Sequence, residues 1–190
     1  MLAKQAAPKR AHGAANRVRI VGGRYRSRLL AFPDGTGLRP TPDRVRETLF
    51  NWLGQDLAGW RCVDLFAGSG ALGFEAASRG AARVLMIERD ANAVAALEKN
   101  RGALGAAVDI VRADALAWLG GNRETFDLAF VDPPFDSDMA ALALAGLAPH
   151  IASGGYVYVE QGAETAVPPG FVVHRSGRAG RSHFALLMKE

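Results

Sequence analysis

Apolar residues recur along this chain in two alternating patterns. From residue 60 onward, short continuous apolar runs typical of buried strands alternate with stretches whose apolar residues recur every three or four positions, as in helices. The expected strands cover residues 61–67, 82–88, 108–113 and 126–132, and the expected helices cover 70–80, 90–104, 114–121 and 138–151. This alternation predicts an α/β fold with a doubly wound, mainly parallel sheet.

The C-terminal end departs from the alternation. Residues 154–161, 170–176 and 182–189 are all strand-like, and no helical stretch separates the last two. Consecutive strands without an intervening helix pair antiparallel, so an antiparallel hairpin is expected at one edge of the sheet.

The N-terminal end also differs. Residues 17–33 predict two short strands around Gly22 and Gly23, which would form a β-hairpin with an arginine-rich face. Residues 41–54 then carry helix signals: Thr41 as N-cap, Pro42 in the first turn, and Gly54 after the last turn. We therefore expect a disordered basic leader over 1–16, an arginine-rich hairpin over 17–40 and one α/β domain over 41–190.

Charge is distributed unevenly. Residues 1–46 contain eleven Lys or Arg and two acids, a net charge of +9, whereas residues 47–190 have a net charge of −5. Such asymmetry suggests a polyanionic partner, most simply nucleic acid, although the basic residues of the leader suit a solubilising tail. A single cysteine, Cys62, excludes an internal disulfide. The chain shows neither a long apolar span nor a secretory signal, so no membrane contact and a cytoplasmic location are expected.

The stretch VDLFAGSGALGFE contains a glycine-rich loop between a strand and a helix. Gly68, Gly70 and Gly73 match the GxGxxG pattern of dinucleotide-binding loops, which favour a pyrophosphate at the helix N-terminus. Asp64 ends the same strand, and its carboxylate would repel a pyrophosphate but attract an ammonium or a sulfonium. S-adenosylmethionine carries both cations and no phosphate, so the pattern favours it over NAD.

Acids also end the next two strands. Glu88 lies eighteen residues beyond Gly70, where a carboxylate can accept both ribose hydroxyls of either cofactor. Asp114 can accept from an adenine amino group beside the Ala115 N–H, and it can also cap the following helix; the two roles are compatible. Successive strands of an open α/β sheet end at one ligand-binding crevice.

The fourth strand ends in VDPPF, where two prolines fix the backbone beside a carboxylate and an aromatic ring. A rigid strand-to-helix turn is the simplest interpretation of this stretch taken alone. The sequence, however, resembles the S-adenosylmethionine-dependent methyltransferases that modify exocyclic amines and carry an Asn/Asp-Pro-Pro-aromatic motif.

The resemblance is more specific to the RsmD family, the 16S rRNA guanine-N2 methyltransferases. It rests on RIVGGRYRSRLL, LRPTPDRVRETLFNWL, DLFAGSGALGFEAASRGA and FDLAFVDPPF, and runs from about Arg19 to the last strand. It implies a Rossmann-like class I methyltransferase domain over 41–190 that uses S-adenosylmethionine and no metal. It also implies 16S rRNA within small-subunit particles as the partner, and we expect a monomer.

Site residues follow from the motifs and the resemblance together. Asp132 and the Pro133 carbonyl would accept hydrogen bonds from the attacking amine, and Phe135 would stack on the base. Whether Asp132 or solvent finally takes the proton is open. The expected cofactor-binding residues are Asp64, Phe66, Gly68, Ser69, Gly70, Glu88, Arg89, Asp114 and Ala115.

The basic residues of the N-terminal segment are candidates for RNA contacts. The hairpin side chains would bind phosphates, with Tyr25 placed to stack on a base, and the arginines at the first helix could reach RNA or the methionine carboxylate, or simply face solvent. The expected RNA-binding residues are Arg17, Arg19, Arg24, Tyr25, Arg26, Arg28, Arg39, Arg44 and Arg46.

Three alternatives remain at the level of the sequence. An adenine-N6 or other exocyclic-amine methyltransferase would share the mechanism and differ in product. A non-catalytic RNA-binding module could keep the fold, but it would have no need for acids at four strand ends. An NAD oxidoreductase would bind nicotinamide and not S-adenosylhomocysteine.

Overall fold

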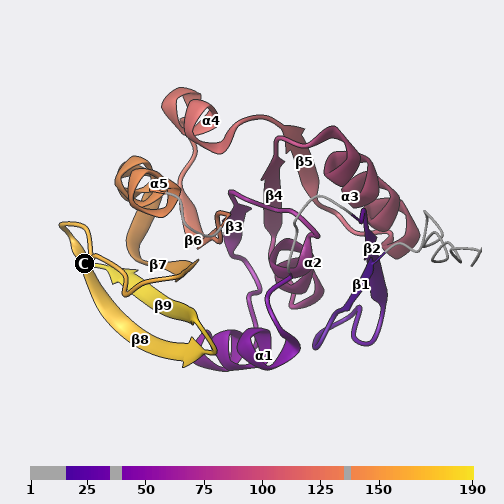
Figure 1. Ribbon diagram of the computed structural model, residues 1–190, viewed down its shortest axis with the longest axis horizontal. Helices are drawn as coiled ribbons and strands as arrows, with labels where there is room; N and C mark the ends of the chain where they lie inside the picture. The colour runs from indigo at the N-terminus through magenta and orange to yellow at the C-terminus, as the bar shows by residue number, and fades with distance from the viewer. Residues whose placement is uncertain (1–15, 35–39, 135–137) are drawn as a thin grey trace, which may run out of the picture.

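The computed structural model describes residues 16–34, 40–134 and 138–190 (Figure 1). Its main sheet has the strand order β5-β4-β3-β6-β7-β9-β8 within these residues. Neighbours are parallel from β5 to β7, and β9 pairs antiparallel with both β7 and β8. The strands are β3 (Arg61–Asp64), β4 (Arg83–Glu88), β5 (Asp109–Arg112), β6 (Phe126–Val131), β7 (Ile151–Gln161), β8 (Phe171–Ala179) and β9 (Ser182–Lys189).

This topology confirms the predicted α/β fold with an antiparallel hairpin at one edge. The last strand, β9, inserts between β7 and β8, so β8 forms the edge. The helices are α1 (Asp43–Trp52), α2 (Ala71–Ser78), α3 (Ala91–Leu104), α4 (Ala115–Gly121) and α5 (Met139–Leu147), and a short 3₁₀ turn, η1, spans Ala148–His150.

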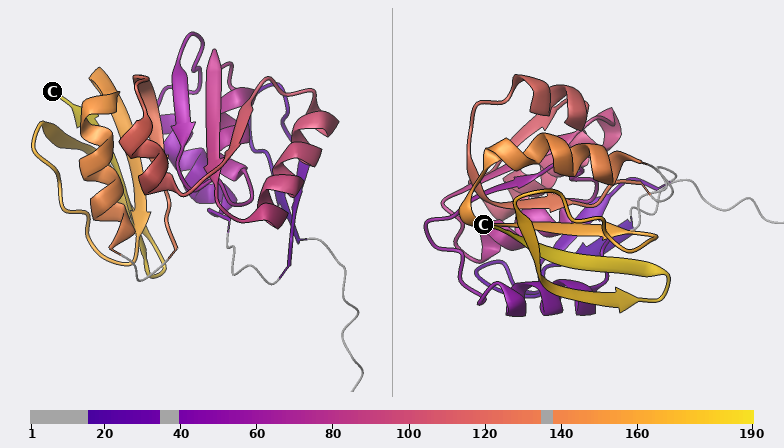
Figure 2. Two further views of the ribbon diagram at one scale, coloured as in Figure 1. Left: turned by 90° about the horizontal axis from the view of Figure 1, so that it is seen from above. Right: turned by 90° about the vertical axis from the view of Figure 1, so that its left-hand side faces the viewer.

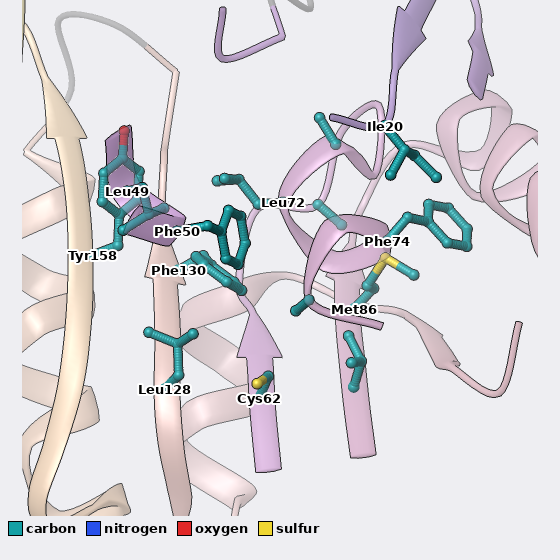
Figure 3. Close-up of a cluster of buried hydrophobic side chains, with 14 of the residues drawn as sticks. Ile20, Leu49, Phe50, Cys62, Leu72, Phe74, Met86, Leu128, Phe130 and Tyr158 are labelled. Atoms are coloured by element: carbon teal, nitrogen blue, oxygen red, sulfur yellow. The ribbon is translucent and has the colours of Figure 1, made fainter. Parts of the chain in front are cut away.

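Helices cover both faces of the sheet, which explains why its central strands are apolar on both sides. Side chains of α1, α2 and α3 share one buried cluster with the sheet, and side chains of α4 and α5 share the other. Figure 2 shows α4 and α5 on the side of the sheet opposite α1. In the first cluster, Phe50 of α1 packs against Phe130 of β6, which in turn contacts Tyr158 of β7 (Figure 3).

The predicted N-terminal hairpin is present as β1 (Asn16–Arg19) and β2 (Leu29–Phe32), which pair antiparallel and stay separate from the main sheet. Its turn packs against α2. The backbone N–H of Arg24 donates to the Ser78 carbonyl at 2.7 Å, and the N–H of Tyr25 donates to the Ser78 hydroxyl at 2.8 Å. β2 lies along α3, where the Asn100 side chain pairs with the backbone N–H and C=O of Ala31.

A buried carboxylate also fastens this hairpin. Glu75 of α2 is fully buried and accepts the backbone N–H groups of Val21 and Gly22, both at 2.8 Å. The same carboxylate pairs with Arg46 at 3.1 Å and Arg79 at 2.9 Å. The hairpin is thus held to the α/β body by hydrogen bonds to a buried ion-pair network.

The first helix differs from its prediction at its start. It begins at Asp43, and Pro42 occupies the N-cap position without a side-chain cap. Thr41 was expected to be the cap, but its buried hydroxyl is 3.2 Å from Asp132 Oδ2 instead. The Thr41 hydroxyl therefore donates to a carboxylate that follows β6, and it does not cap the helix.

None of the helices in the described part of the chain combines the length and the apolar character needed to cross a membrane.

Candidate active site

A cavity of about 1200 Å³ opens at the carboxyl ends of β3, β4, β5, β6 and β7. Its wall includes an acidic residue from the end of each of these strands. They are Asp64, Glu88, Asp114, Asp132 and Glu160. The sequence predicted the first four, since the parallel strands all end at the same edge of the sheet.

Asp64 is the most buried of these acids, with 1% of its surface exposed. Its Oδ2 accepts the Gly73 N–H at 3.1 Å, whereas its buried Oδ1 has no hydrogen-bond partner among the described residues. Burial raises the pKa of Asp64 to about 7, and the nearby Glu88 carboxylate adds to this effect against the opposing backbone hydrogen bonds. An unsatisfied buried carboxylate oxygen on a cavity wall fits the ammonium of S-adenosylmethionine.

The glycines of the loop have separate structural reasons. Gly70 lies just before α2 with φ of +79°, a left-handed conformation that L side chains rarely adopt. A Cβ at Gly73 would lie 2.6 Å from Met86 Sδ, so this glycine is required where α2 packs on β4. Both features bring the loop and the start of the helix close to the strand ends.

Glu88 and Asp114 each hold local structure as well as lining the cavity. Glu88 accepts the N–H of Gly68 at 2.9 Å and of Asp90 at 2.7 Å, which fixes the glycine loop next to β4. Asp114 Oδ1 accepts from Leu116 and Ala117 and so caps α4, as one of its two interpretations predicted. Ribose and adenine contacts by these acids stay predictions, as do contacts by Phe66, Ser69, Arg89 and Ala115, which also line the cavity.

Asp132 follows directly after β6 and shares the cavity with Asp64. Burial raises the pKa of Asp132 well above its ordinary value, the carboxylates of Glu160 and Asp64 raise it further, and the Thr41 hydrogen bond opposes them. Pro133, which follows, is buried in the same wall. Phe135 lies outside the described residues.

Glu160 is a functional candidate that the sequence analysis missed. It lies near the end of β7 with 6% of its surface exposed, and it accepts the hydroxyls of Tyr158 at 2.9 Å and Ser182 at 2.7 Å. The signal was available: an acid near the end of a strand-like run is the same pattern that identified Asp64 and Glu88. Among the described residues, no group of three or more potential ligands is arranged to hold a metal ion.

The predicted RNA-binding residues do not all reach the surface. Arg17, Arg24, Arg26, Arg28 and Arg44 are exposed, and Arg19 remains 54% exposed although it pairs with Asp43 at 2.8 Å. For these six residues RNA contact stays a prediction, and Arg39 lies outside the described residues.

Two members of that set need correction. Arg46 is completely buried and pairs with Asp43 and Glu75, so it is a structural residue and cannot meet a phosphate. Tyr25 is 8% exposed and belongs to the core beneath the hairpin, with the Arg24 guanidinium 5.6 Å from its ring centre. It is not available to stack on a base.

The chain is similar in sequence to a known protein family and to proteins of known name. A family model described as "Conserved hypothetical protein 95" matches residues 18–188. Ribosomal RNA small subunit methyltransferase D of Escherichia coli is 40% identical over 185 residues, which cover 94% of this chain and 93% of that protein. Its counterpart in Haemophilus influenzae is also 40% identical, over 154 residues that cover 77% of this chain and 80% of that protein.

Solved structures agree with the fold. The Escherichia coli yhhF methyltransferase structure has a TM-score of 0.84 at 40% identity, covering 92% of this chain and 99% of that one. The Thermus thermophilus 16S rRNA N2 G1207 methyltransferase, solved with AdoMet and guanosine, has a TM-score of 0.72 at 21% identity, covering 98% of this chain and 53% of that one. At this lower identity the likeness shows the fold alone.

Proposed function

Because this chain belongs to the RsmD family of ribosomal RNA small subunit methyltransferases, we propose that it methylates the exocyclic N2 amine of one guanine in 16S rRNA. S-adenosylmethionine would be the methyl donor. The proposal rests above all on one observation. Asp64, whose Oδ1 is unpaired among the described residues, lines the same cavity at the strand ends as Asp132 and Pro133.

Asp64 would hold the ammonium of the cofactor, and Glu88 and Asp114 would accept from its ribose and adenine. Bound in this way, the cofactor supplies an electrophilic methyl group on its sulfonium. Asp132 and the Pro133 carbonyl would then orient the guanine amine toward that methyl, so that proximity lowers the barrier.

The amine needs this help because its lone pair is delocalised into the guanine ring. As the new C–N bond forms, the S–C bond breaks, sulfur keeps the bonding electrons, and nitrogen becomes tetrahedral and positive. Two fixed acceptors aimed at its protons stabilise that charge, and the nitrogen then releases one proton. The raised pKa of Asp132 makes its carboxylate a stronger proton acceptor than an ordinary aspartate.

The target base must leave its stack to enter the cavity, whereas the RNA backbone would follow the exposed arginines of the hairpin. We further propose that the protein acts as a monomer, on rRNA within small-subunit particles, in the cytoplasm.

Methyl transfer from labelled S-adenosylmethionine tests the function directly. Unmethylated small subunits, naked 16S rRNA and DNA serve as substrates, and the products are digested to nucleosides. We expect N2-methylguanosine from rRNA or subunits only. Methyladenosine would support the adenine-N6 alternative, and the absence of any product despite cofactor binding would favour a non-catalytic module.

Replacing Asp132 with alanine tests the site. Asp132→Ala should lower the rate of methyl transfer by about a hundredfold or more, since it removes one of two transition-state acceptors. The dissociation constant of S-adenosylhomocysteine should change little. Asp138→Ala serves as the control, because Asp138 is an exposed acid that lies close to Asp132 in the sequence. Equal loss of cofactor binding would make Asp132 a structural residue.

A further inference from the structure

The register of the sheet places a second carboxylate beside Asp132. Phe130 of β6 pairs with Tyr158 of β7, and Val131 pairs with Val159, so the next pair in line is Asp132 with Glu160. Paired residues on adjacent strands project to the same face, with strands about 4.8 Å apart. The Phe130 and Tyr158 rings meet on this face with centroids 6.5 Å apart, and both acids line the cavity beyond them.

The Glu160 carboxyl group lies in an unusual setting. It is 6% exposed, and among the described residues its partners are two neutral hydroxyls, those of Tyr158 and Ser182, with no ion pair. A carboxylate offers about four lone-pair sites, so these two bonds leave acceptor capacity on each oxygen. Burying such a group next to Asp132 is unfavourable unless a ligand supplies donors.

The guanine base has a matching edge. Its Watson–Crick side presents two adjacent donors, the ring N1–H and the N2 amine, whereas adenine presents an acceptor at N1 beside its amine. If Asp132 accepts a hydrogen bond from the N2 amine, the neighbouring carboxylate faces N1. A carboxylate there accepts a hydrogen bond from the N1–H of guanine. With adenine it faces the lone pair of N1, so that the carboxylate and the adenine N1 are both left without a donor.

We infer that Glu160 determines base specificity by accepting the N1–H of the target guanine, while Tyr158 and Ser182 fix its carboxylate. The inference rests on the proposed guanine-N2 methylation and adds to it the residue that selects guanine. Asp64 lines the same cavity with its unpaired Oδ1, so an ammonium-binding position and a base-reading position are both present in one cavity.

A purine analogue separates base recognition from a structural role. 2-Aminopurine keeps the reactive N2 amine but has a lone pair at N1 in place of N1–H. Once the modified guanine has been mapped with the unaltered protein, small subunits carrying 2-aminopurine at that nucleotide are compared with subunits carrying guanine. The measured quantity is kcat/KM for each, together with the dissociation constant of S-adenosylhomocysteine.

Glu160→Gln keeps the shape of the side chain and lets its amide donate to N1. We expect kcat/KM for guanine to fall by about tenfold or more, as for the loss of a hydrogen bond to a charged group, while kcat/KM for 2-aminopurine stays level or rises. The guanine preference should therefore decrease by at least about tenfold, with unchanged cofactor affinity. Glu164→Gln, an exposed residue beyond the same strand, should leave both rates unchanged.

Three results would overturn the inference. An equal fall for both bases would make Glu160 structural, an unchanged preference would remove it from base recognition, and a weaker affinity for S-adenosylhomocysteine alone would move it to the cofactor. If Glu160→Gln does not fold, Glu160→Asp, which withdraws the carboxyl group by one methylene, should show the same loss of preference. Failure of the proposed function is distinguishable, because the unaltered protein would then form no N2-methylguanosine at all.

Discussion

At the scale of single residues, burial without a counter-charge raises the pKa of Asp64. Its pKa of about 7, against an ordinary 3.8, means that the folded protein keeps a proton that the unfolded chain has released. The free energy of unfolding therefore falls as the pH rises from about 4 to about 7, and it levels off above that range. Above about pH 7, where Asp64 is ionised in the folded protein, its partly unpaired carboxylate lowers stability but can bind a cation.

Asp64→Asn should remove this unfavourable term. We expect the variant to be more stable than the unaltered protein by up to about 4 kcal/mol at pH 8, with the difference shrinking toward pH 4. Its affinity for S-adenosylhomocysteine should fall at least tenfold, because the ammonium loses its carboxylate. Chemical denaturation at several pH values measures the first effect and calorimetric titration the second.

The exposed Asp138→Asn variant is the matched control for this experiment, and it should show no pH-dependent gain. A stability gain of equal size at pH 4 and pH 8 would contradict the assignment of the raised pKa to Asp64.

At the scale of elements, the N-terminal hairpin depends on close backbone packing against α2. Gly23 has φ of +69°, and a Cβ there would lie 2.0 Å from the Ser78 carbonyl oxygen. The neighbouring backbone N–H groups of Val21 and Gly22 reach the buried Glu75. No side chain fits between the turn and the helix, so glycine is required for docking.

Gly23→Ala should therefore displace the hairpin. We expect a loss of roughly 2 kcal/mol or more in stability and weaker RNA binding, with little change in affinity for S-adenosylhomocysteine. Gly54→Ala is the control, since Gly54 also has a positive φ, +86°, but a Cβ there would meet no other atom within 4 Å. It should lose only the backbone-strain part, about 1 kcal/mol, and keep RNA binding. Equal effects of the two variants would mean that the close approach to Ser78 is unimportant.

At the scale of the whole molecule, charge is distributed unevenly between the N-terminal segment and the rest of the chain. The first 46 residues carry a net charge of +9 and the rest carry −5, and seven acids and two arginines line the cavity. An acidic cavity repels phosphates and accepts a base that presents donors, whereas exposed arginines attract the RNA backbone. The two halves would thus hold different parts of one RNA strand.

Charge reversal in the hairpin should change the salt dependence of RNA binding. Arg24→Glu with Arg26→Glu should weaken binding and reduce the slope of log K against log salt by roughly 0.7 to 0.9 for each phosphate that the protein no longer neutralises. Arg123→Glu with Arg175→Glu alters the net charge equally from exposed positions outside the hairpin, and it should leave the slope unchanged. Identical slopes for the two double variants would move the RNA surface away from the hairpin.

The sequence by itself determined the α/β fold, the edge hairpin and the acids at the strand ends. These features follow from local periodicity and from the rule that parallel strands end at one edge, so Asp64, Glu88 and Asp132 could be placed together without coordinates. Family motifs supplied the cofactor and the reaction, because DPPF and the glycine loop are contiguous in the chain.

Only the tertiary structure decided which polar residues are buried and what they bind. Arg46 and Tyr25 belong to a sequence segment rich in exposed arginines, yet Arg46 is buried beside Glu75 of α2 and Tyr25 is buried where the hairpin turn contacts Ser78. Thr41 does not cap the first helix but donates its hydroxyl to Asp132, ninety-one residues away. Glu160 lies next to Asp132 because of the register between β6 and β7. Such contacts join segments far apart in the chain, and local pattern carries no information about them.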